Sequence, residues 1–294
     1  MTKNEITSWF KSLQDEICQG IESSDGKGKF REDPWERTGG GGGRTRIIEG
    51  TVIEKGGVNF SAVYGSTPEK ILQALNLNEA DFYVTGVSIV MHPSNPWVPI
   101  IHMNVRYFEM SNGVYWFGGG IDLTPHYIIP EDARFFHQQL RTACEKFDHE
   151  YYPKFKKWAD DYFYIKHRKE TRGIGGIFFD RLTGDSDSEK KEIWHFVKEV
   201  GKTFYPTYKE LIDRNRNKDF SDDHKKWQLV RRGRYVEFNL VYDKGTKFGL
   251  DTDGRTESIL MSLPPQANWV YDHKPVGQSL EEKTLSKLKK GIQW

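Results

Sequence analysis

The segment from Ile100 to Phe108 carries, at alternate positions, groups that can move a proton and bind an anion. Side chains of a strand point alternately to opposite faces, so His102, Asn104 and Arg106 share one face. The other face takes the set Ile101, Met103, Val105 and Tyr107. This pattern predicts a polar ligand site over one side of a sheet and a core beneath the other. A half-solvated antiparallel sheet whose outer face is merely polar is the alternative interpretation.

The preceding segment, from Gly86 to His92, repeats this arrangement. Ser88 and His92 share one parity with Val90, while the other parity is apolar. The Pro-Ser-Asn-Pro sequence at 93–96 is typical of a loop that returns the chain antiparallel. The polar positions of both strands are therefore expected on one side of the same sheet.

The wider sequence predicts an α+β fold, in which a broad, mainly antiparallel sheet is covered by helices in a single domain of residues 1–294. Strand-like runs cluster with few long helices between them; they are Ile47–Glu54, Val58–Tyr64, Phe82–Met91, Val98–Phe108, Val114–Leu123 and Tyr235–Tyr242. Thr2 and Glu5 are spaced as a capping box before an amphipathic first helix. Further helices are expected near 68–77, 133–147, 155–163 and 189–212.

Composition narrows the class of protein. The 43 basic and 42 acidic residues nearly cancel, which does not favour a nucleic-acid partner. Only Cys18 and Cys144 are present, so a disulfide framework is not expected and a reducing compartment fits. No apolar run approaches the roughly 18 to 20 residues of a transmembrane helix. The N-terminal region, with Asp15 and Glu16, does not suit a transit peptide, so we expect a cytoplasmic protein.

The five glycines Gly39–Gly43 predict a flexible segment without regular structure. The run lacks the Gly-Lys-Ser/Thr ending of a phosphate-binding loop. It is followed by Arg44 and Arg46, which gives two interpretations. The segment is either a flap that carries these arginines to an anionic ligand or an exposed hinge.

Four histidines, His92, His102, His137 and His167, could bind a divalent metal if they converge in space. Their spacing is unlike the tight His-Glu-x-x-His pair of zinc enzymes. His137 falls on the apolar side of its expected helix, four residues after Ala133. For each one taken alone, a hydrogen-bonded structural role is favoured.

Three glycine-bearing motifs each carry a charged group. Trp116–Pro125 ends an expected strand with three glycines before Asp122, and glycines clear space for a flat ligand to approach the backbone. Asp122 could then accept N–H hydrogen bonds or act as a base. Arg172 and Arg255 also stand beside glycines. Ordinary turns with a capping aspartate and solvated arginines are the alternative, which would have to apply three times.

These segments together resemble the oxygen-dependent coproporphyrinogen III oxidases over nearly the whole chain. The resemblance rests on long, ordered motifs: Glu54–Ser61, Asn95-Pro96 with His102–Glu109, Gly118–Pro125, Tyr162–Arg168, Arg172–Gly176 and Arg255–Pro265. Two departures are Gly56, where many members have Ala, and Asp253, which adds a negative charge beside a proposed substrate contact.

The resemblance implies oxidative decarboxylation of two propionates of coproporphyrinogen III to vinyl groups, giving protoporphyrinogen IX for haem synthesis. Molecular oxygen would be the co-substrate, and no organic cofactor is expected because the electron-rich porphyrinogen can itself reduce oxygen. His102 would be the proton donor, and the region 235–269 would form a homodimer. The implied substrate contacts are Ser88, Asn104, Val105, Arg106, Asp253, Gly254 and Arg255. His92, His102, His137 and His167 match positions that are divalent-metal ligands in some members.

The residues themselves suit such a substrate. A tetracarboxylate favours arginine partners, here Arg106, Arg172 and Arg255, and the pyrrole N–H donors favour a central carboxylate such as Asp122. Two alternatives stay open. A tetrapyrrole carrier with the same basic site would bind without consuming oxygen, and a metal-dependent oxygenase for another polycarboxylate would lose activity on chelation.

Overall fold

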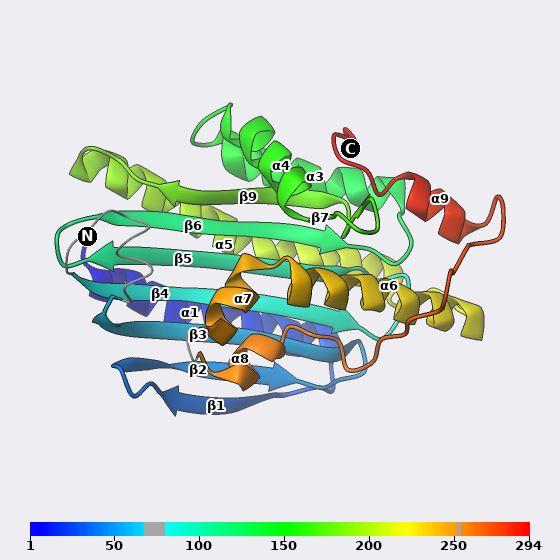
Figure 1. The fold of residues 1–294 in the computed structure, drawn as a ribbon, viewed down its shortest axis with the longest axis horizontal. Helices are drawn as coiled ribbons and strands as arrows, with labels where there is room; N and C mark the ends of the chain where they lie inside the picture. Colours follow the sequence, from blue (N-terminus) through cyan, green and yellow to red (C-terminus); the bar gives the residue numbers. More distant parts are fainter. Residues whose placement is uncertain (68–79, 252–253) are drawn as a thin grey trace.

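A seven-stranded antiparallel sheet forms the centre of the molecule, in the order β1-β2-β3-β4-β5-β6-β9 (Figure 1). The computed structural model describes residues 1–67, 80–251 and 254–294. The helix expected near 68–77 and the predicted contact Asp253 lie outside the described residues. The strands are β1 (Phe30–Glu36), β2 (Gly41–Ile48), β3 (Ile53–Ser66), β4 (Asp81–Pro93), β5 (Ile100–Met110), β6 (Tyr115–Thr124) and β9 (Gly175–Leu182). The strands β7 (Tyr164–Ile165) and β8 (Glu170–Thr171) form a separate small hairpin.

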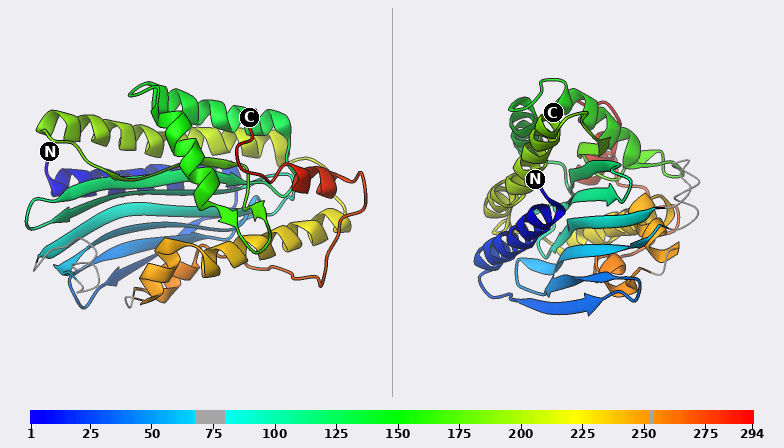
Figure 2. Two further views of the ribbon diagram at one scale, coloured as in Figure 1. Left: turned by 45° about the horizontal axis from the view of Figure 1, so that its top comes forward. Right: turned by 90° about the vertical axis from the view of Figure 1, so that its left-hand side faces the viewer.

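Helices lie on both faces of this sheet, which confirms the predicted α+β class (Figures 1 and 2). The rear face packs against α1 (Lys3–Asp25) and α5 (Asp187–Asn215), with α3 (Pro130–Glu145) behind α5 and α4 (Tyr151–Tyr162) against β9. The front face is covered by α6 (Asp222–Val241), α7 (Lys244–Asp251) and α8 (Thr256–Leu260). The C-terminal segment carries α9 (Leu280–Ser286). None of the helices in the described ranges is both long and apolar enough to cross a membrane.

The first helix shows how sequence and packing agree. The Thr2 side chain accepts the N–H of Glu5, and Glu5 accepts the N–H of Thr2, so the predicted capping box is confirmed. At the other end, Asp25 is buried and accepts the backbone N–H groups of Val52 and Ile53. These bonds fix the end of α1 to the start of β3.

The register of the central strands confirms the predicted two-sided sheet. Ser88 of β4 lies opposite Asn104 of β5, and His102 lies opposite Asp122 of β6. The intervening positions, including Ile89 and Met103, face the rear and are fully buried in the main core. The front of the sheet therefore keeps the polar side chains, and the rear takes the apolar ones.

The predicted strand Tyr235–Tyr242 is wrong, because this segment belongs to helix α6. Ser221 and His224 form a capping box at its start, and Asp222 and Asp223 occupy its first turn. The buried residues of α6 include charged ones; they are Trp227, Gln228, Val230, Arg231, Arg232, Gly233, Arg234, Tyr235, Phe238 and Asn239. Buried arginines interrupt the apolar stripe of the helix. In the sequence, only the local alternation of the last residues of α6 is therefore apparent.

The glycine run Gly39–Gly43 was expected to lack regular structure, but Gly41–Gly43 belong to β2; the flexibility of the run stays a prediction. Gly40 has a φ of 111° and Gly41 a φ of 79° at the turn into β2, and Gly41–Gly43 pair with β3. A side chain at Gly43 would meet the indole of Trp35 at 2.3 Å, so the missing side chain admits that ring. The expected strand 47–54 is divided by the turn between β2 and β3.

The arginines that follow the glycines are structural. Arg44 and Arg46 contact the carboxylate of Asp15 on α1 at 2.8 and 2.7 Å, and Arg46 also contacts Glu32 at 2.8 Å. They therefore tie the β1–β2 edge of the sheet to helix α1.

Candidate active site

The front face brings together His102 of β5 and Asp122 of β6. The Nδ1 atom of His102 lies 2.7 Å from Oδ1 of Asp122, to which it donates a hydrogen bond. The Asp122 side chain is 1% exposed, whereas His102 is 22% exposed. This arrangement fixes the imidazole through Nδ1 and leaves Nε2 as the nitrogen that can exchange a proton with a ligand.

Arg172 completes this buried group from the loop before β9. Its Nη2 donates to both carboxylate oxygens of Asp122, at 2.9 and 2.8 Å, and its Nη1 donates to Asn239 of α6 at 2.8 Å. The guanidinium also packs on the rings of Phe163, Tyr235 and Phe238, 4.4, 4.6 and 4.7 Å from their centres. The front helix and the sheet are thus joined through one arginine.

The charges of this group stabilise one another. Burial by itself would raise the pKa of Asp122, but Arg172 and His102 outweigh it and lower that pKa. Burial would likewise lower the pKa of Arg172, and Asp122 raises it. Asp122 therefore stays a carboxylate that accepts the hydrogen bond from His102.

Arg106 stands beside this group on the same face of β5. Its Nη1 donates to Oδ1 of Asn104 at 2.8 Å, and its Nη2 donates to Oδ1 of Asp180 on β9 at 2.7 Å. Arg106 and Asp180 are 30% and 32% exposed, so both are open to solvent. A side chain at Gly118 would lie 2.5 Å from Asp180 Oδ1 and 2.8 Å from Arg106 Nη2, so this glycine provides the space for the pair.

Arg255, at the start of α8, reaches the opposite edge of the sheet. Its Nη2 donates to Oδ2 of Asp33 on β1 at 2.5 Å. Within the described ranges its buried Nη1 has no hydrogen-bond partner. The neighbouring Ser258 bonds to Thr45 of β2 at 2.8 Å, so α8 is held on the sheet beside this pair.

Small and polar residues cover the front of the sheet between these arginines. Gly86 and Gly118 flank Arg106, and Ser88 and Gly120 flank Asn104 on the neighbouring strands. The three glycines 118–120 lie inside β6, not at the end of a strand as expected. All three are buried, and Gly118 and Gly120 share the front face with Asp122, where they add no side chain over the sheet.

Two predicted site residues occupy other places. Val105 is fully buried and its side chain faces the rear core, so it offers a ligand no side-chain contact. Asp122 is not positioned as an open anchor for pyrrole N–H groups, because both its oxygens are taken by Arg172 and one by His102. Gly254, the predicted contact next to Arg255, donates its backbone N–H to the carbonyl of Gly249.

The four histidines do not come together in the structure. His92 is fully buried and donates from Nε2 to the carbonyl of Ser262 at 2.8 Å, and burial lowers its pKa to about 3. His137 donates to the carbonyl of Ile174 at 3.0 Å, and burial lowers its pKa to about 3. His167 donates to Glu237 at 2.7 Å.

The donor set therefore does not fit a metal. In the parts of the chain that are described, no group of three or more His, Cys, Asp or Glu side chains could hold a metal ion. A metal site made by the four histidines would require their side chains to converge, and they do not. The chemistry proposed for this site therefore involves no metal.

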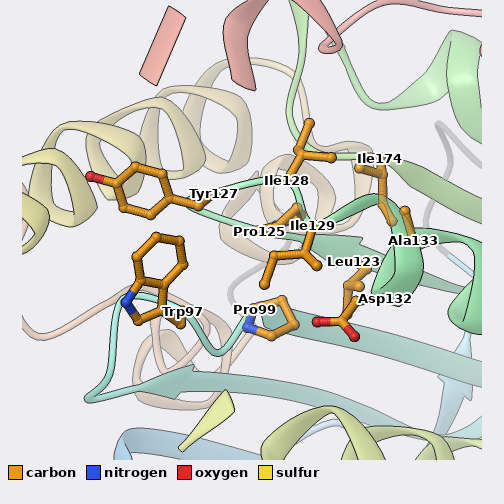
Figure 3. Close-up of a pocket in the computed structure, with 10 residues that line it drawn as sticks. All are labelled: Trp97, Pro99, Leu123, Pro125, Tyr127, Ile128, Ile129, Asp132, Ala133 and Ile174. Carbon is orange, nitrogen blue, oxygen red and sulfur yellow. The ribbon is translucent and has the colours of Figure 1, made fainter. Parts of the chain in front are cut away.

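The pocket in Figure 3 is lined by none of His102, Asp122 and Arg172. It lies between the loop before β5 and the start of α3, and its lining includes Trp97, Pro99, Leu123 and Asp132. Its volume is about 10 Å³, which is room for roughly one water molecule. Leu123 faces the opposite side of β6 from Asp122, so this pocket does not open onto the front face.

Three residues of the site were not predicted individually. Asp180 ends the glycine-rich segment that begins at Arg172, and Asp33 precedes the glycine run. Asn239 follows Tyr235 by four residues, a helical spacing that becomes visible only when α6 is recognised as a helix. Asp180 and Asp33 each lie near a glycine motif, but the sequence does not show which arginine each one meets.

The fold and this group of side chains define a class of site. A histidine supported by a buried carboxylate can transfer a proton. Arg106 beside it and Arg255 at the opposite edge of the sheet are partly exposed and can bind the carboxylates of a polyanionic ligand. Glycine and serine positions of the central strands lie between the two arginines.

Comparisons with known proteins agree with that class. The family profile described as Coproporphyrinogen III oxidase matches residues 5–294. Coproporphyrinogen-III oxidase 1, chloroplastic, of Arabidopsis thaliana is 47% identical over 300 residues, which cover 97% of this chain and 77% of that protein. The oxygen-dependent coproporphyrinogen-III oxidase of Drosophila melanogaster is 50% identical over 298 residues, covering 96% of this chain and 75% of that protein. The chain belongs to the coproporphyrinogen III oxidase family, which confirms the resemblance seen in its motifs.

Proposed function

We propose that this chain catalyses the oxygen-dependent oxidative decarboxylation of two propionates of coproporphyrinogen III to vinyl groups, giving protoporphyrinogen IX in haem biosynthesis. Its membership of the family supports this reaction. The observation in the structure that carries the proposal is the His102–Asp122–Arg172 group beside Arg106 on the front face.

The stoichiometry of the reaction assigns a task to His102. Each propionate loses carbon dioxide, one proton and two electrons to become a vinyl group. Oxygen accepts the two electrons with two protons and becomes hydrogen peroxide, so each decarboxylation takes up one net proton. In this proposal, Nε2 of protonated His102 delivers that proton, because Nδ1 is already held by Asp122 at 2.7 Å.

Asp122 and Arg172 act through His102 as positioning residues. Asp122 holds the imidazole in place, while Arg172 keeps Asp122 ionised and in place. This role replaces the two sequence-based hypotheses that Asp122 binds pyrrole N–H groups and that Arg172 binds a propionate, because both side chains are at most 3% exposed.

The more exposed polar residues form the substrate surface. Arg106 and Arg255 bind propionates, and Ser88 and Asn104 line the sheet between the strands. Asp253 and Gly254 are predicted substrate contacts beside Arg255, and Val105 is a predicted contact through its backbone. These three roles remain proposals that follow from the family resemblance.

A homodimer through the region 235–269 also remains a proposal. This region carries large apolar side chains that are 41% to 52% exposed, namely Leu240, Val241, Phe248, Leu250 and Trp269. Such a group is typical of a surface that a partner covers. Sedimentation should therefore show a dimer that Val241→Lys weakens, whereas Phe220→Lys, at an apolar residue that is 46% exposed outside the region, should leave it intact.

Two further predictions concern the setting of the enzyme. Oxygen is the proposed co-substrate, in keeping with the oxygen-dependent relatives, and no organic cofactor is proposed. A cytoplasmic location stays a prediction. It is supported by Cys18 and Cys144, which are free, buried thiols whose pKa values are raised to about 12 by burial.

The decisive assay incubates chelator-treated protein with coproporphyrinogen III, with and without oxygen, and follows protoporphyrin fluorescence after the products are oxidised. The proposal expects oxygen-dependent product in metal-free buffer. Tight binding without product would instead indicate a tetrapyrrole carrier. Activity that returns only with an added divalent metal would indicate a metal-dependent oxygenase.

A further inference from the structure

Both exposed arginines of the substrate surface are held by a carboxylate of the chain itself. Arg255 contacts Asp33 at 2.5 Å, with exposed fractions of 28% and 37%. Arg106 contacts Asp180 at 2.7 Å, with exposed fractions of 30% and 32%. Each arginine offers the group that a propionate needs, and each is already engaged by one aspartate.

These pairs are incomplete compared with the buried pair of the catalytic group. The Arg172 guanidinium reaches both oxygens of Asp122, whereas Arg255 makes a single contact with Asp33 through Nη2. Within the described parts of the chain, Nη1 of Arg255 is buried and has no hydrogen-bond partner. A carboxylate placed in line with the guanidinium could accept two parallel hydrogen bonds there.

The two aspartates come from opposite edges of the sheet. Asp33 lies on β1 and Asp180 on β9, which are the first and last strands in the sheet order (Figure 1). The glycine- and serine-rich surface of the central strands lies between them. A broad ligand with carboxylates around its rim could therefore meet both arginines, each at the place of an existing aspartate.

The chemistry of the reaction makes an exchangeable partner useful. The substrate arrives with four carboxylates, and two of them leave as carbon dioxide. An arginine that bound a lost carboxylate would face a vinyl group and lack a partner, which is unfavourable for a partly buried charge. A carboxylate of the protein that returns to the arginine removes this cost and favours release of the product.

We propose that Asp33 and Asp180 are exchange partners for the substrate's carboxylates. They hold Arg255 and Arg106 in the free protein, yield them to propionates when substrate binds, and pair with them again when product leaves. This inference rests on the proposed function, because it takes the two arginines as propionate contacts. Asp33 and Asp180 then set affinity by competing with the ligand, and neither takes part in the decarboxylation.

The test measures binding of coproporphyrin III, the oxidised and unreactive tetracarboxylate, by fluorescence titration. Asp33→Asn and Asp180→Asn keep the size of the side chain and remove its charge. Each is expected to tighten binding about two- to fivefold, the range set by a partly exposed ion pair. The affinity of each variant should also fall more steeply with added salt, because the site has become more cationic.

Asp15→Asn is the matched control. Asp15 pairs with Arg44 and Arg46 at similar distances but lies on the rear side of the sheet with α1. Its substitution makes the same change in net charge and should leave the affinity for coproporphyrin III unchanged. Asp33→Glu, which restores a carboxylate, should return the affinity toward that of the wild type.

Steady-state kinetics supply a second readout. With coproporphyrinogen III, removal of a competing carboxylate should lower KM, since the effect is on binding. Unchanged or weaker binding in both Asp33→Asn and Asp180→Asn would overturn the inference, as would equal tightening in Asp15→Asn. Normal wild-type turnover with such a result would leave the proposed function standing, whereas a wild type that neither binds nor turns over would reject that function first.

Discussion

The two faces of strand β5 differ in the burial and in the contacts of their residues. Met103 on the rear is fully buried in a continuous apolar core with helices α1 and α5. Asn104, the next residue, faces the front and accepts a hydrogen bond from Arg106 at 2.8 Å. The alternation of side chains along β5 thus places core residues on one face and the polar residues of the site on the other.

Ion pairs show the same division. Arg44 and Asp15 on the rear side are 24% and 52% exposed, so solvent screens their interaction. Arg172 and Asp122 at the front are 3% and 1% exposed, so each depends on the other to remain charged. The buried pair orders His102, the proposed proton donor, whereas the exposed pair joins helix α1 to strand β2.

Removing Arg172 should produce the largest effect. Arg172→Ala leaves Asp122 buried without its partner and should lower the free energy of unfolding by about 3–5 kcal/mol. The rear variant Asp15→Ala, which removes the more exposed member of its pair, should cost about 0–1 kcal/mol. Urea denaturation of both variants measures the difference. Equal losses would show that the two pairs do not differ in the way their burial indicates.

A neighbouring pair of substitutions separates the two faces of β5. Met103→Ala should destabilise the protein by about 2–5 kcal/mol through loss of core packing. Asn104→Ala should change stability by less than about 1 kcal/mol, but should lower kcat/KM about tenfold, because Arg106 loses a hydrogen-bond partner. Denaturation and initial rates, both at a temperature where the variants are folded, provide the comparison. A larger loss of kcat/KM in Met103→Ala than in Asn104→Ala would contradict this difference between the two faces.

A carboxylate of the rear layer should affect stability in acid but not turnover. Burial would raise the pKa of Asp25, but the backbone N–H donors of Ile53, Gly28, Thr51 and Val52 outweigh it and lower the pKa to about 2. A folded pKa below the ordinary value stabilises the protein above about pH 4 and loses that contribution as the pH falls toward 2. The contribution at neutral pH is about 2 kcal/mol.

Asp25→Asn should therefore flatten the stability profile between about pH 4 and pH 2. Thermal unfolding measured across that range checks the expectation, and turnover at neutral pH should stay close to wild type. A profile as steep as that of the wild type would assign the acid sensitivity to other carboxylates.

Much of the fold and of the site could be predicted from the alternation of apolar and polar residues and from the spacing of the motifs. The alternation at 100–108 predicted both faces of β5, and register then placed His102 opposite Asp122. Helix α6 was missed because Arg231 and Arg232 occupy its buried side, where apolar residues are normally the signal. The regular structure of Gly41–Gly43 was not predicted, because the space above Gly43 is filled by Trp35 of the neighbouring strand, a contact that the sequence does not show.

The pairing of charges lay beyond the sequence. Arg106, Arg172 and Arg255 were predicted as equivalent propionate contacts. The structure buries Arg172 on Asp122 and leaves the other two partly exposed on Asp180 and Asp33. Burial depends on which strands and helices meet, so residue type alone could not separate a positioning arginine from a binding one.

The turnover of His102→Gln tests the central claim most directly, because His102 joins the buried pair to the exposed front of the sheet. The account predicts that kcat with coproporphyrinogen III and oxygen falls about 10²- to 10⁴-fold, the usual contribution of a general acid. The unfolding free energy should change by no more than about 1 kcal/mol, since the side chain is 22% exposed. Near-normal turnover in this variant would contradict the account and move the proton donor away from the front face of β5.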